Sequence, residues 1–246
     1  MSRHFELSHQ TGRHAAAHGE ERAVASPSSP RLPELKLAPA TSTEIGKLVQ
    51  RVFFLLNDFG PRMVVFTGFD NGGGSRRVCA HSADLLAAQV PGSVCVVDAH
   101  LRSPGMHKIF GCSNEKGLGN LMAESVTVED AATRIRDSNL WVITSGSATG
   151  DWAQIGKLEM MRACIAQLRA RFDYVLIDAP ILGNYPDVMS LGILADGVIL
   201  VLQAHSTRRE VACRVKHELE ASGVQVLGAV LNDRTFPIPE GVYLRL

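Results

Sequence analysis

A glycine-rich loop between a strand-like and a helix-like segment is the part of this sequence best placed to bind phosphate. The apolar run 63–67 leads into the loop, and residues 76–89 follow with helix-compatible spacing. A P-loop at such a junction reads G-x-x-x-x-G-K-[ST]; its lysine contacts the β- and γ-phosphates and its hydroxyl holds magnesium. Here Gly74 stands at the last glycine position, Ser75 at the lysine position and Arg76 at the hydroxyl position. We therefore expect the backbone of a nucleotide site without the side chains of ordinary P-loop ATP turnover. The candidate nucleotide-binding residues of the loop are Gly72, Gly73, Gly74, Ser75, Arg76 and Arg77.

Two further strand-like runs end in an aspartate. Asp98 ends the run 94–98 and is followed by His100, and Asp178 ends the run 174–178. Carboxylates at strand ends beside a glycine-rich loop are typical of magnesium-dependent phosphoryl-transfer sites. Asp98 and Asp178 are thus candidate magnesium ligands, and with His100 they are the only catalytic candidates. Two alternatives stay open: the carboxylates could be structural groups held by backbone N–H groups, and His100 a buried histidine paired with either aspartate.

Composition limits the classes of function. The chain has 246 residues, a net charge of zero and a pI of about 7.1, so nothing in it favours nucleic acid or an anionic membrane as a partner. No apolar run reaches the roughly 20 residues of a membrane span, and the beginning of the chain lacks a signal peptide's apolar core. The five cysteines are scattered without a C-x-x-C pair, which favours free thiols over a metal site. We expect a cytoplasmic protein without direct membrane insertion.

The order of the elements predicts a single α/β domain. Residues 1–40 are rich in His, Ser and Pro and are expected to be a disordered tail, and 41–246 form the domain. Thr43 is the expected N-cap of a first helix. Continuously apolar strands that alternate with helices indicate a doubly wound, mostly parallel sheet flanked by helices. The expected strands are 63–67, 94–98, 140–144, 174–178, 198–202 and 226–231, and the helix-compatible segments are 76–89, 117–123, 128–136, 155–171, 187–194 and 207–222.

In the residues and spacing of these segments, the chain resembles the bacterial tyrosine kinases (BY-kinases), the cytosolic subunits or domains of polysaccharide co-polymerases. The resemblance covers residues 42–246. It includes VDAHLRSP (97–104), similar to the family's Walker A′ segment, and the Walker B-like run DYVLIDAP (173–180), followed by ADGV (195–198) and GAVLN (228–232). It implies a P-loop NTPase-like fold, ATP or ADP with magnesium as ligands, and an adenine contact at Asn232. It also implies a role in capsule or exopolysaccharide export, peripheral at the inner membrane through a membrane-embedded chain-length regulator.

The chain departs from the family pattern at several positions. The second aspartate of the Walker A′ motif is replaced by His100, which removes the expected base. The Glu-x-x-Arg-x-x-Arg oligomerisation helix reads Glu44, Lys47 and Gln50, so self-association is expected to be weak. In place of a C-terminal tyrosine cluster there is only Tyr243, the one candidate phosphorylation site.

These departures lead to a main hypothesis and two alternatives. The main hypothesis is a pseudokinase that acts through protein–protein interaction and binds ATP or ADP without turnover, or binds no cofactor. The first alternative is an active ATP-dependent tyrosine autokinase in which Arg76 or Arg77 replaces the lysine. The second is a deviant-Walker positioning ATPase, which shares the fold but also needs a loop lysine; the chain has none between Lys47 and Lys108.

Overall fold

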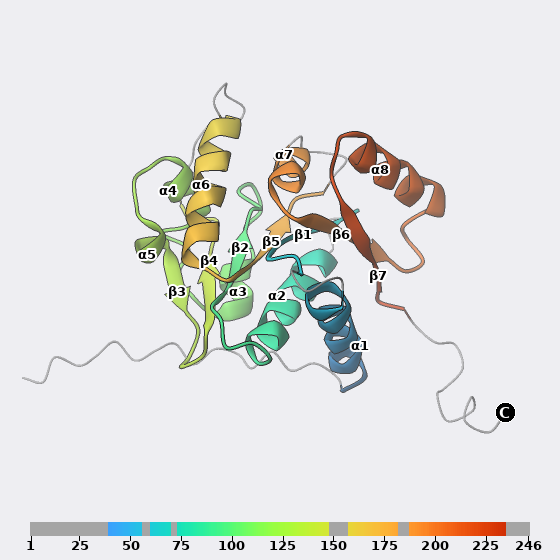
Figure 1. The fold of residues 1–246 in the computed structure, drawn as a ribbon, viewed down its shortest axis with the longest axis horizontal. Coiled ribbons are helices and arrows are strands. Elements are labelled where there is room, and N and C mark those ends of the chain that lie inside the picture. The colour runs from blue at the N-terminus through green and yellow to red at the C-terminus, as the bar shows by residue number, and fades with distance from the viewer. Residues whose placement is uncertain (1–38, 56–59, 70–72, 148–156, 182–186, 235–246) are drawn as a thin grey trace, which may run out of the picture.

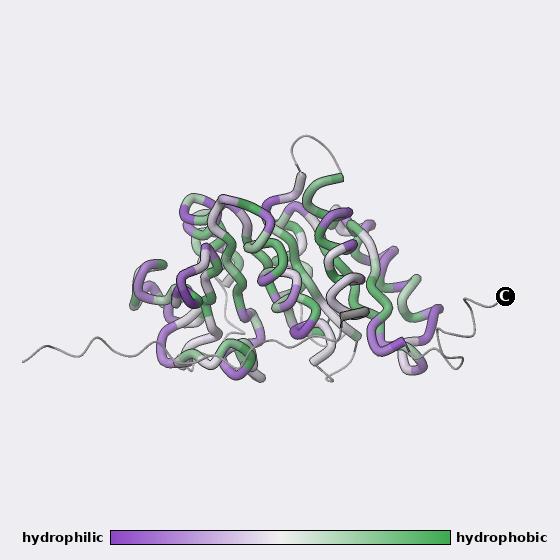
Figure 2. The backbone as a smooth tube through the Cα atoms, turned by 90° about the horizontal axis from the view of Figure 1, so that it is seen from below, coloured by the Kyte–Doolittle hydropathy of each residue, from purple (hydrophilic) through white to green (hydrophobic). Residues whose placement is uncertain are grey.

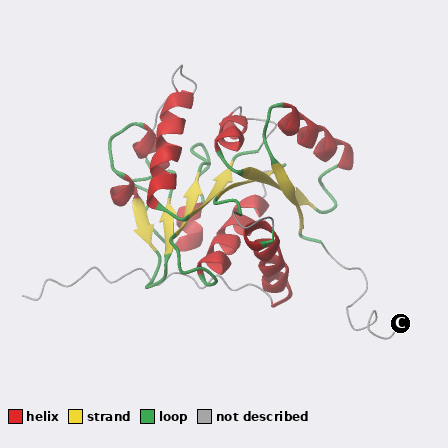
Figure 3. Cartoon of the chain, viewed as in Figure 1, coloured by secondary structure: helices red, strands yellow, loops and turns green. Residues whose placement is uncertain are grey.

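A seven-stranded sheet forms the centre of the molecule (Figures 1 and 3). The structure, a computed structural model, describes residues 39–55, 60–69, 73–147, 157–181 and 187–234. The strand order is β3-β4-β2-β5-β1-β6-β7, and every neighbouring pair is parallel except β3 and β4. This confirms the predicted α/β fold with a mostly parallel sheet. The strands are β1 (Met63–Gly68), β2 (Val94–Asp98), β3 (Ala132–Arg134), β4 (Leu140–Ile143), β5 (Tyr174–Ala179), β6 (Gly197–Gln203) and β7 (Val226–Asn232).

Helices cover both faces of the sheet (Figure 1). One face carries α1 (Pro39–Val49), the π-helical turn η1 (Gln50–Phe54), α2 (Gly74–Ala87) and α3 (Met106–Phe110). The other face carries α4 (Leu118–Met122), α5 (Val128–Ala131), α6 (Lys157–Arg171), α7 (Asp187–Leu194) and α8 (Arg209–Ala221). Each face has its own apolar core, because the strand side chains alternate between the two helix layers. The central strands are apolar along their length (Figure 2), as expected for a sheet buried on both sides.

The structure corrects two predictions made from the sequence and adds one helix. The expected helix over 128–136 ends at Ala131, and the chain then forms β3, a three-residue antiparallel edge strand. Thr43 is not an N-cap, because α1 already begins at Pro39, a residue type favoured in the first helical turn. Helix α3 was not predicted at all. The tail at 1–38 lies outside the described residues, so the predicted domain boundaries remain predictions.

Asp196 anchors the beginning of the central strand β1. Its Oδ2 atom accepts hydrogen bonds from the backbone N–H groups of Arg62 (2.8 Å) and Met63 (2.7 Å), and its Oδ1 atom accepts one from Arg169 Nη2 (2.8 Å). Burial alone would raise the pKa of Asp196, but these hydrogen bonds outweigh it and the pKa lies below its ordinary value. Among the described residues no helix has the length and apolarity to span a bilayer.

Candidate functional site

Helix α2 directs its N-terminus at the carboxyl ends of β1 and β5. Gly73 caps it with φ of 70°, a left-handed conformation that glycine adopts without strain. Ser75 and Arg76 lie in the first turn of this helix, and Thr67 Oγ1, at the end of β1, donates a 2.6 Å hydrogen bond to the carbonyl of Pro180 beyond β5. Gly72 lies outside the described residues. Residues 73–77 of the candidate loop thus lie at the edge of the sheet where doubly wound folds bind ligands.

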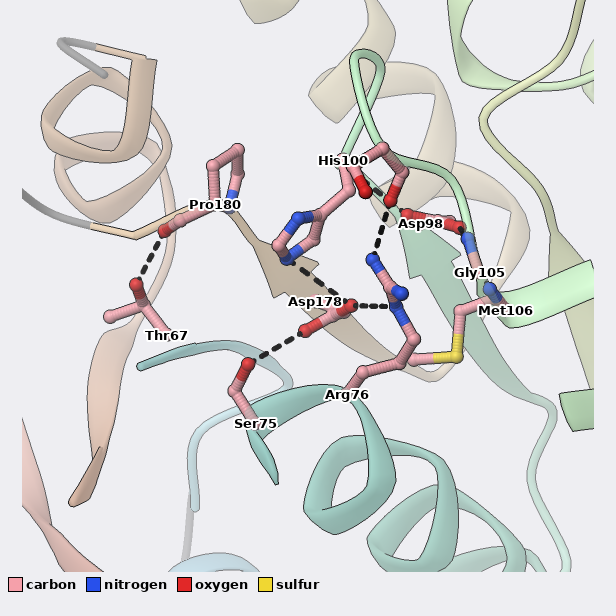
Figure 4. Close-up of polar contacts among 10 residues, drawn as sticks. Thr67, Ser75, Arg76, Asp98, His100, Gly105, Met106, Asp178 and Pro180 are labelled. Atoms are coloured by element: carbon pink, nitrogen blue, oxygen red, sulfur yellow. Dashed lines mark hydrogen bonds and ion pairs between the residues drawn. The ribbon is translucent and has the colours of Figure 1, made fainter. Parts of the chain in front are cut away.

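Arg76 turns inward to Asp178 (Figure 4). Its Nε atom lies 3.1 Å from Asp178 Oδ2, and its Nη2 atom donates a 2.7 Å hydrogen bond to the carbonyl oxygen of Ser103. The Arg76 side chain is 17% exposed and Asp178 is fully buried. Arg76 therefore points into the site and not into solvent, and its guanidinium neutralises a carboxylate at the centre of the site.

Two other polar side chains face the same carboxylate. Ser75 Oγ lies 3.4 Å from Asp178 Oδ1. His100 Nε2 lies 3.4 Å from Asp178 Oδ2, within ion-pair distance but outside hydrogen-bond geometry. Of the two partners expected for His100, its ring meets Asp178, while its backbone N–H donates to Asp98.

Asp98 is held by backbone N–H groups (Figure 4). Its Oδ1 atom accepts from the N–H of His100 (3.0 Å), and Oδ2 accepts from the N–H groups of Gly105 (2.8 Å) and Met106 (2.9 Å). The side chain is fully buried. Asp98 therefore organises the loop between β2 and α3, which is the structural alternative considered for it.

Cys79 is a buried thiol close enough to the two carboxylates to be influenced by their charges. Burial, and after it the negative charges of Asp178 and Asp98, raise the pKa of the Cys79 thiol well above its usual range. The thiol is therefore neutral and not a nucleophile. All five cysteines are free, and Cys213 is the exposed one; no group of His, Cys, Asp and Glu among the described residues could hold a metal ion.

Asn232 belongs to a second polar group beside the loop. Its Nδ2 atom donates to Gln203 Oε1 (3.3 Å), and a Cβ atom on Gly74 would lie only 2.8 Å from that Nδ2. Gln203 Nε2 in turn donates to Asp233 Oδ2 (2.8 Å), which also lies 3.9 Å from the exposed Nη2 of Arg77. Asn232 and Arg77 thus flank the start of α2, and Gln203 and Asp233 are members of the site that the sequence did not single out.

The expected oligomerisation residues lie away from this site, on the α1 side. Lys47 Nζ pairs with Glu44 Oε1 at 2.6 Å within the helix, and Gln50 Nε2 donates to Gln89 Oε1 at 2.7 Å. Their role in self-association remains a prediction. The candidate phosphorylation site Tyr243 lies outside the described residues.

The sequence is similar to several bacterial tyrosine kinases, although no family model matches the chain. The tyrosine-protein kinase YwqD of Bacillus subtilis is 29% identical over 173 residues, which cover 70% of this chain and 73% of YwqD. CpsD of Streptococcus agalactiae is 27% identical over 161 residues, covering 65% of this chain and 70% of CpsD. The tyrosine-protein kinase wzc of Salmonella typhimurium is 26% identical over 171 residues, which cover 69% of this chain but only 24% of wzc.

Solved structures share the fold. The chimerical protein CapA2B2 aligns with a TM-score of 0.73 at 22% identity, covering 81% of this chain and 87% of that one. The kinase domain of Escherichia coli tyrosine kinase ETK aligns with a TM-score of 0.68 at 22% identity, covering 81% and 80%. The septum site-determining protein MinD from Pyrococcus horikoshii, solved with Mg-ADP, aligns with a TM-score of 0.55 at 23% identity, covering 75% and 76%. The chain is thus similar in sequence to bacterial tyrosine kinases such as YwqD and CpsD, and it shares the mostly parallel α/β fold of the solved structures.

Proposed function

We propose that this chain is a non-catalytic BY-kinase-like subunit of a capsule or exopolysaccharide biosynthesis and export system. It acts by binding an inner-membrane chain-length regulator, and it is cytoplasmic and peripheral to the membrane through that partner. The observation that carries the proposal is the ion pair between Arg76 and Asp178 at the centre of a P-loop with no lysine.

The argument against phosphoryl transfer starts from what that reaction needs. P-loop enzymes hold the β- and γ-phosphates with a lysine and hold magnesium with a Ser/Thr hydroxyl and a carboxylate. Here Ser75 replaces the lysine, and losing one preorganised charge of this kind costs roughly 10² to 10³ in rate. His100 replaces the expected base of the Walker A′ motif and lies against Asp178. With Arg76 at the hydroxyl position, the site lacks reactive groups at three positions, which supports a degenerate Walker A and A′ pair and a pseudokinase.

The donor set does not fit magnesium. The hydroxyl position is an arginine, and that arginine is paired with Asp178, the carboxylate that would hold the ion. Asp98 is already bonded to three backbone N–H groups. The proposed role therefore involves no metal ion, although proteins of this fold such as MinD of P. horikoshii are solved with Mg-ADP.

Related chains support a protein partner. The solved relative CapA2B2 is a chimera, and wzc is matched over only 24% of its length, so domains of this kind occur joined to further polypeptide. Because this chain has the same fold, it keeps a surface that a protein partner could bind even though its site lacks reactive groups.

The test measures phosphate transfer and polymer output separately. The purified chain is incubated with Mg-ATP, alone and with the chain-length regulator, and analysed for phosphotyrosine by mass spectrometry; none is expected. In cells, the charge-neutral pair Arg76→Met/Asp178→Asn is compared with the wild-type chain and with deletion of the gene. Asp98 is avoided because it organises a loop. We expect the variant to restore polymer output to the wild-type level, while the deletion lowers it.

Phosphate on Tyr243 or on the partner would contradict the proposal and support the active autokinase instead. Arg77 would then be the candidate replacement for the lysine, since its side chain is 60% exposed at the rim of the site and lies 3.9 Å from Asp233. Loss of polymer output in a folded variant would point the same way.

A further inference from the structure

The Arg76 guanidinium lies where a P-loop protein would bring a metal ion to its strand-end carboxylate. Arg76 stands at the sequence position whose hydroxyl binds magnesium in a P-loop. Its Nε atom lies 3.1 Å from Asp178 Oδ2, at the end of the neighbouring strand β5. A side chain that would supply a metal ligand is thus replaced by one that supplies the positive charge itself.

All four oxygens of the two carboxylates already face donors. Asp178 Oδ2 faces Arg76 and His100, and Oδ1 faces Ser75. Both oxygens of Asp98 accept backbone N–H groups. Magnesium binds oxygen at 2.0–2.1 Å with near-octahedral geometry, so an ion on Asp178 would have to displace the guanidinium.

The surroundings are shaped to the guanidinium. Its Nη2 atom donates to the Ser103 carbonyl at 2.7 Å, which fixes the plane of the group. Its Nη1 and Cζ atoms lie against Gly105, where a Cβ atom would overlap them. One side chain thereby joins α2, β5 and the loop before α3.

We propose that Arg76 is a built-in replacement for the divalent cation, an inference that rests on the proposed non-catalytic role of the same site. The site keeps its folded arrangement without metal. Any nucleotide that the loop binds is bound as the free anion, with an affinity that magnesium does not increase.

The test uses the full chain and two probes, Mg²⁺ and ADP. For the wild type, the unfolding temperature should be the same with and without Mg²⁺. The ADP affinity measured by calorimetry in Mg²⁺ should lie within about twofold of the affinity measured in EDTA. Arg76→Thr restores a hydroxyl and frees Asp178. It should unfold at a lower temperature than wild type in EDTA and regain roughly 5–10 °C when Mg²⁺ reaches 100 times its dissociation constant. Its Mn²⁺ complex should be detectable by electron paramagnetic resonance.

Two control variants distinguish the effect of the positive charge of Arg76 from the effect of a substitution at this part of the helix. Arg76→Lys keeps a positive charge beside Asp178 and should not respond to Mg²⁺. Arg77→Thr makes the same change at the next residue, leaves Arg76 in place and should also not respond.

Magnesium-dependent stabilisation or magnesium-dependent ADP binding in the wild type would overturn the inference. This wild-type test does not depend on whether Arg76→Thr folds. A folded Arg76→Thr that gains no Mg²⁺ or Mn²⁺ response would also overturn it. Phosphotyrosine formation, by contrast, tests the proposed function: a chain that transfers no phosphate but binds Mg-ADP better than ADP refutes the metal replacement alone.

Discussion

Replacing Arg76 by methionine should destabilise the fold far more than replacing its neighbour Arg77. Methionine keeps most of the aliphatic stem and removes the charge. Asp178 is fully buried, so it would lose its cation without gaining water. Removing one partner of a buried ion pair typically costs about 3–5 kcal/mol. Because Ser75 and His100 still face the carboxylate, we expect the lower end, about 3 kcal/mol.

The Arg77→Met variant is the matched control. Its guanidinium is 60% exposed and lies 3.9 Å from Asp233, which is 54% exposed. Exposed pairs of this kind contribute about 0–1 kcal/mol. The two variants change the same residue type at adjacent helix positions, so helix propensity cancels in the comparison.

The assay is equilibrium urea unfolding at pH 7, followed by circular dichroism. The double variant Arg76→Met/Asp178→Asn completes the cycle: removing both charges should cost less than the sum of the single changes by about 1–3 kcal/mol. The reasoning is refuted if Arg76→Met costs no more than Arg77→Met. It is equally refuted if the unfolding costs of Arg76→Met and Asp178→Asn, each measured singly, simply add in the double variant, because the two side chains would then not be coupled.

Three further predictions concern Gly105, Asp196 and the cysteines. Gly105→Ala should cost about 1–3 kcal/mol in urea unfolding of the wild type, because the new methyl group overlaps the guanidinium, but much less in Arg76→Met; equal costs in both backgrounds would contradict the contact. Asp196→Ala should cost about 1–3 kcal/mol at pH 7, since two backbone N–H groups at the start of β1 lose their acceptor. The pKa of Asp196 is lower in the folded state than in the unfolded state, so its contribution to the free energy of unfolding is complete above the ordinary aspartate pKa and is lost as pH falls through the folded-state pKa. The difference in unfolding free energy between wild type and Asp196→Ala should therefore shrink towards pH 3. A difference independent of pH would contradict this. In the native chain a thiol reagent followed by absorbance should label Cys213 at once, whereas the buried thiols should react only on unfolding; fast labelling of more than two thiols would show that the core opens easily. The buried thiols are Cys79, Cys95 and Cys164.

The sequence predicted the parts of the fold that repeat a pattern. Six apolar runs became six strands of the sheet, because strands buried on both faces need continuous apolar residues. It missed β3, since three residues with exposed Thr133 and Arg134 carry no alternation that could be recognised. The direction of Arg76 could not be predicted, because it depends on Asp178, which lies 102 positions later, and on the close approach that Gly105 permits.

The strand order also has a consequence for how the chain folds during synthesis. β1 and β2 do not pair with each other; β5 lies between them. Until β5 is made, helix α2 contacts both strands, and the two strands lie one strand apart, about 9–10 Å. β1 ends at residue 68 and β5 begins at residue 174, a separation of 106 positions (174 − 68). At about 5–20 residues per second, the edge of β1 that will pair with β5 stays unpaired for roughly 5–20 s during synthesis. The strand that closes this gap is the one that carries Asp178, so β1 and β2 are joined through β5 in the same step that forms the buried ion pair.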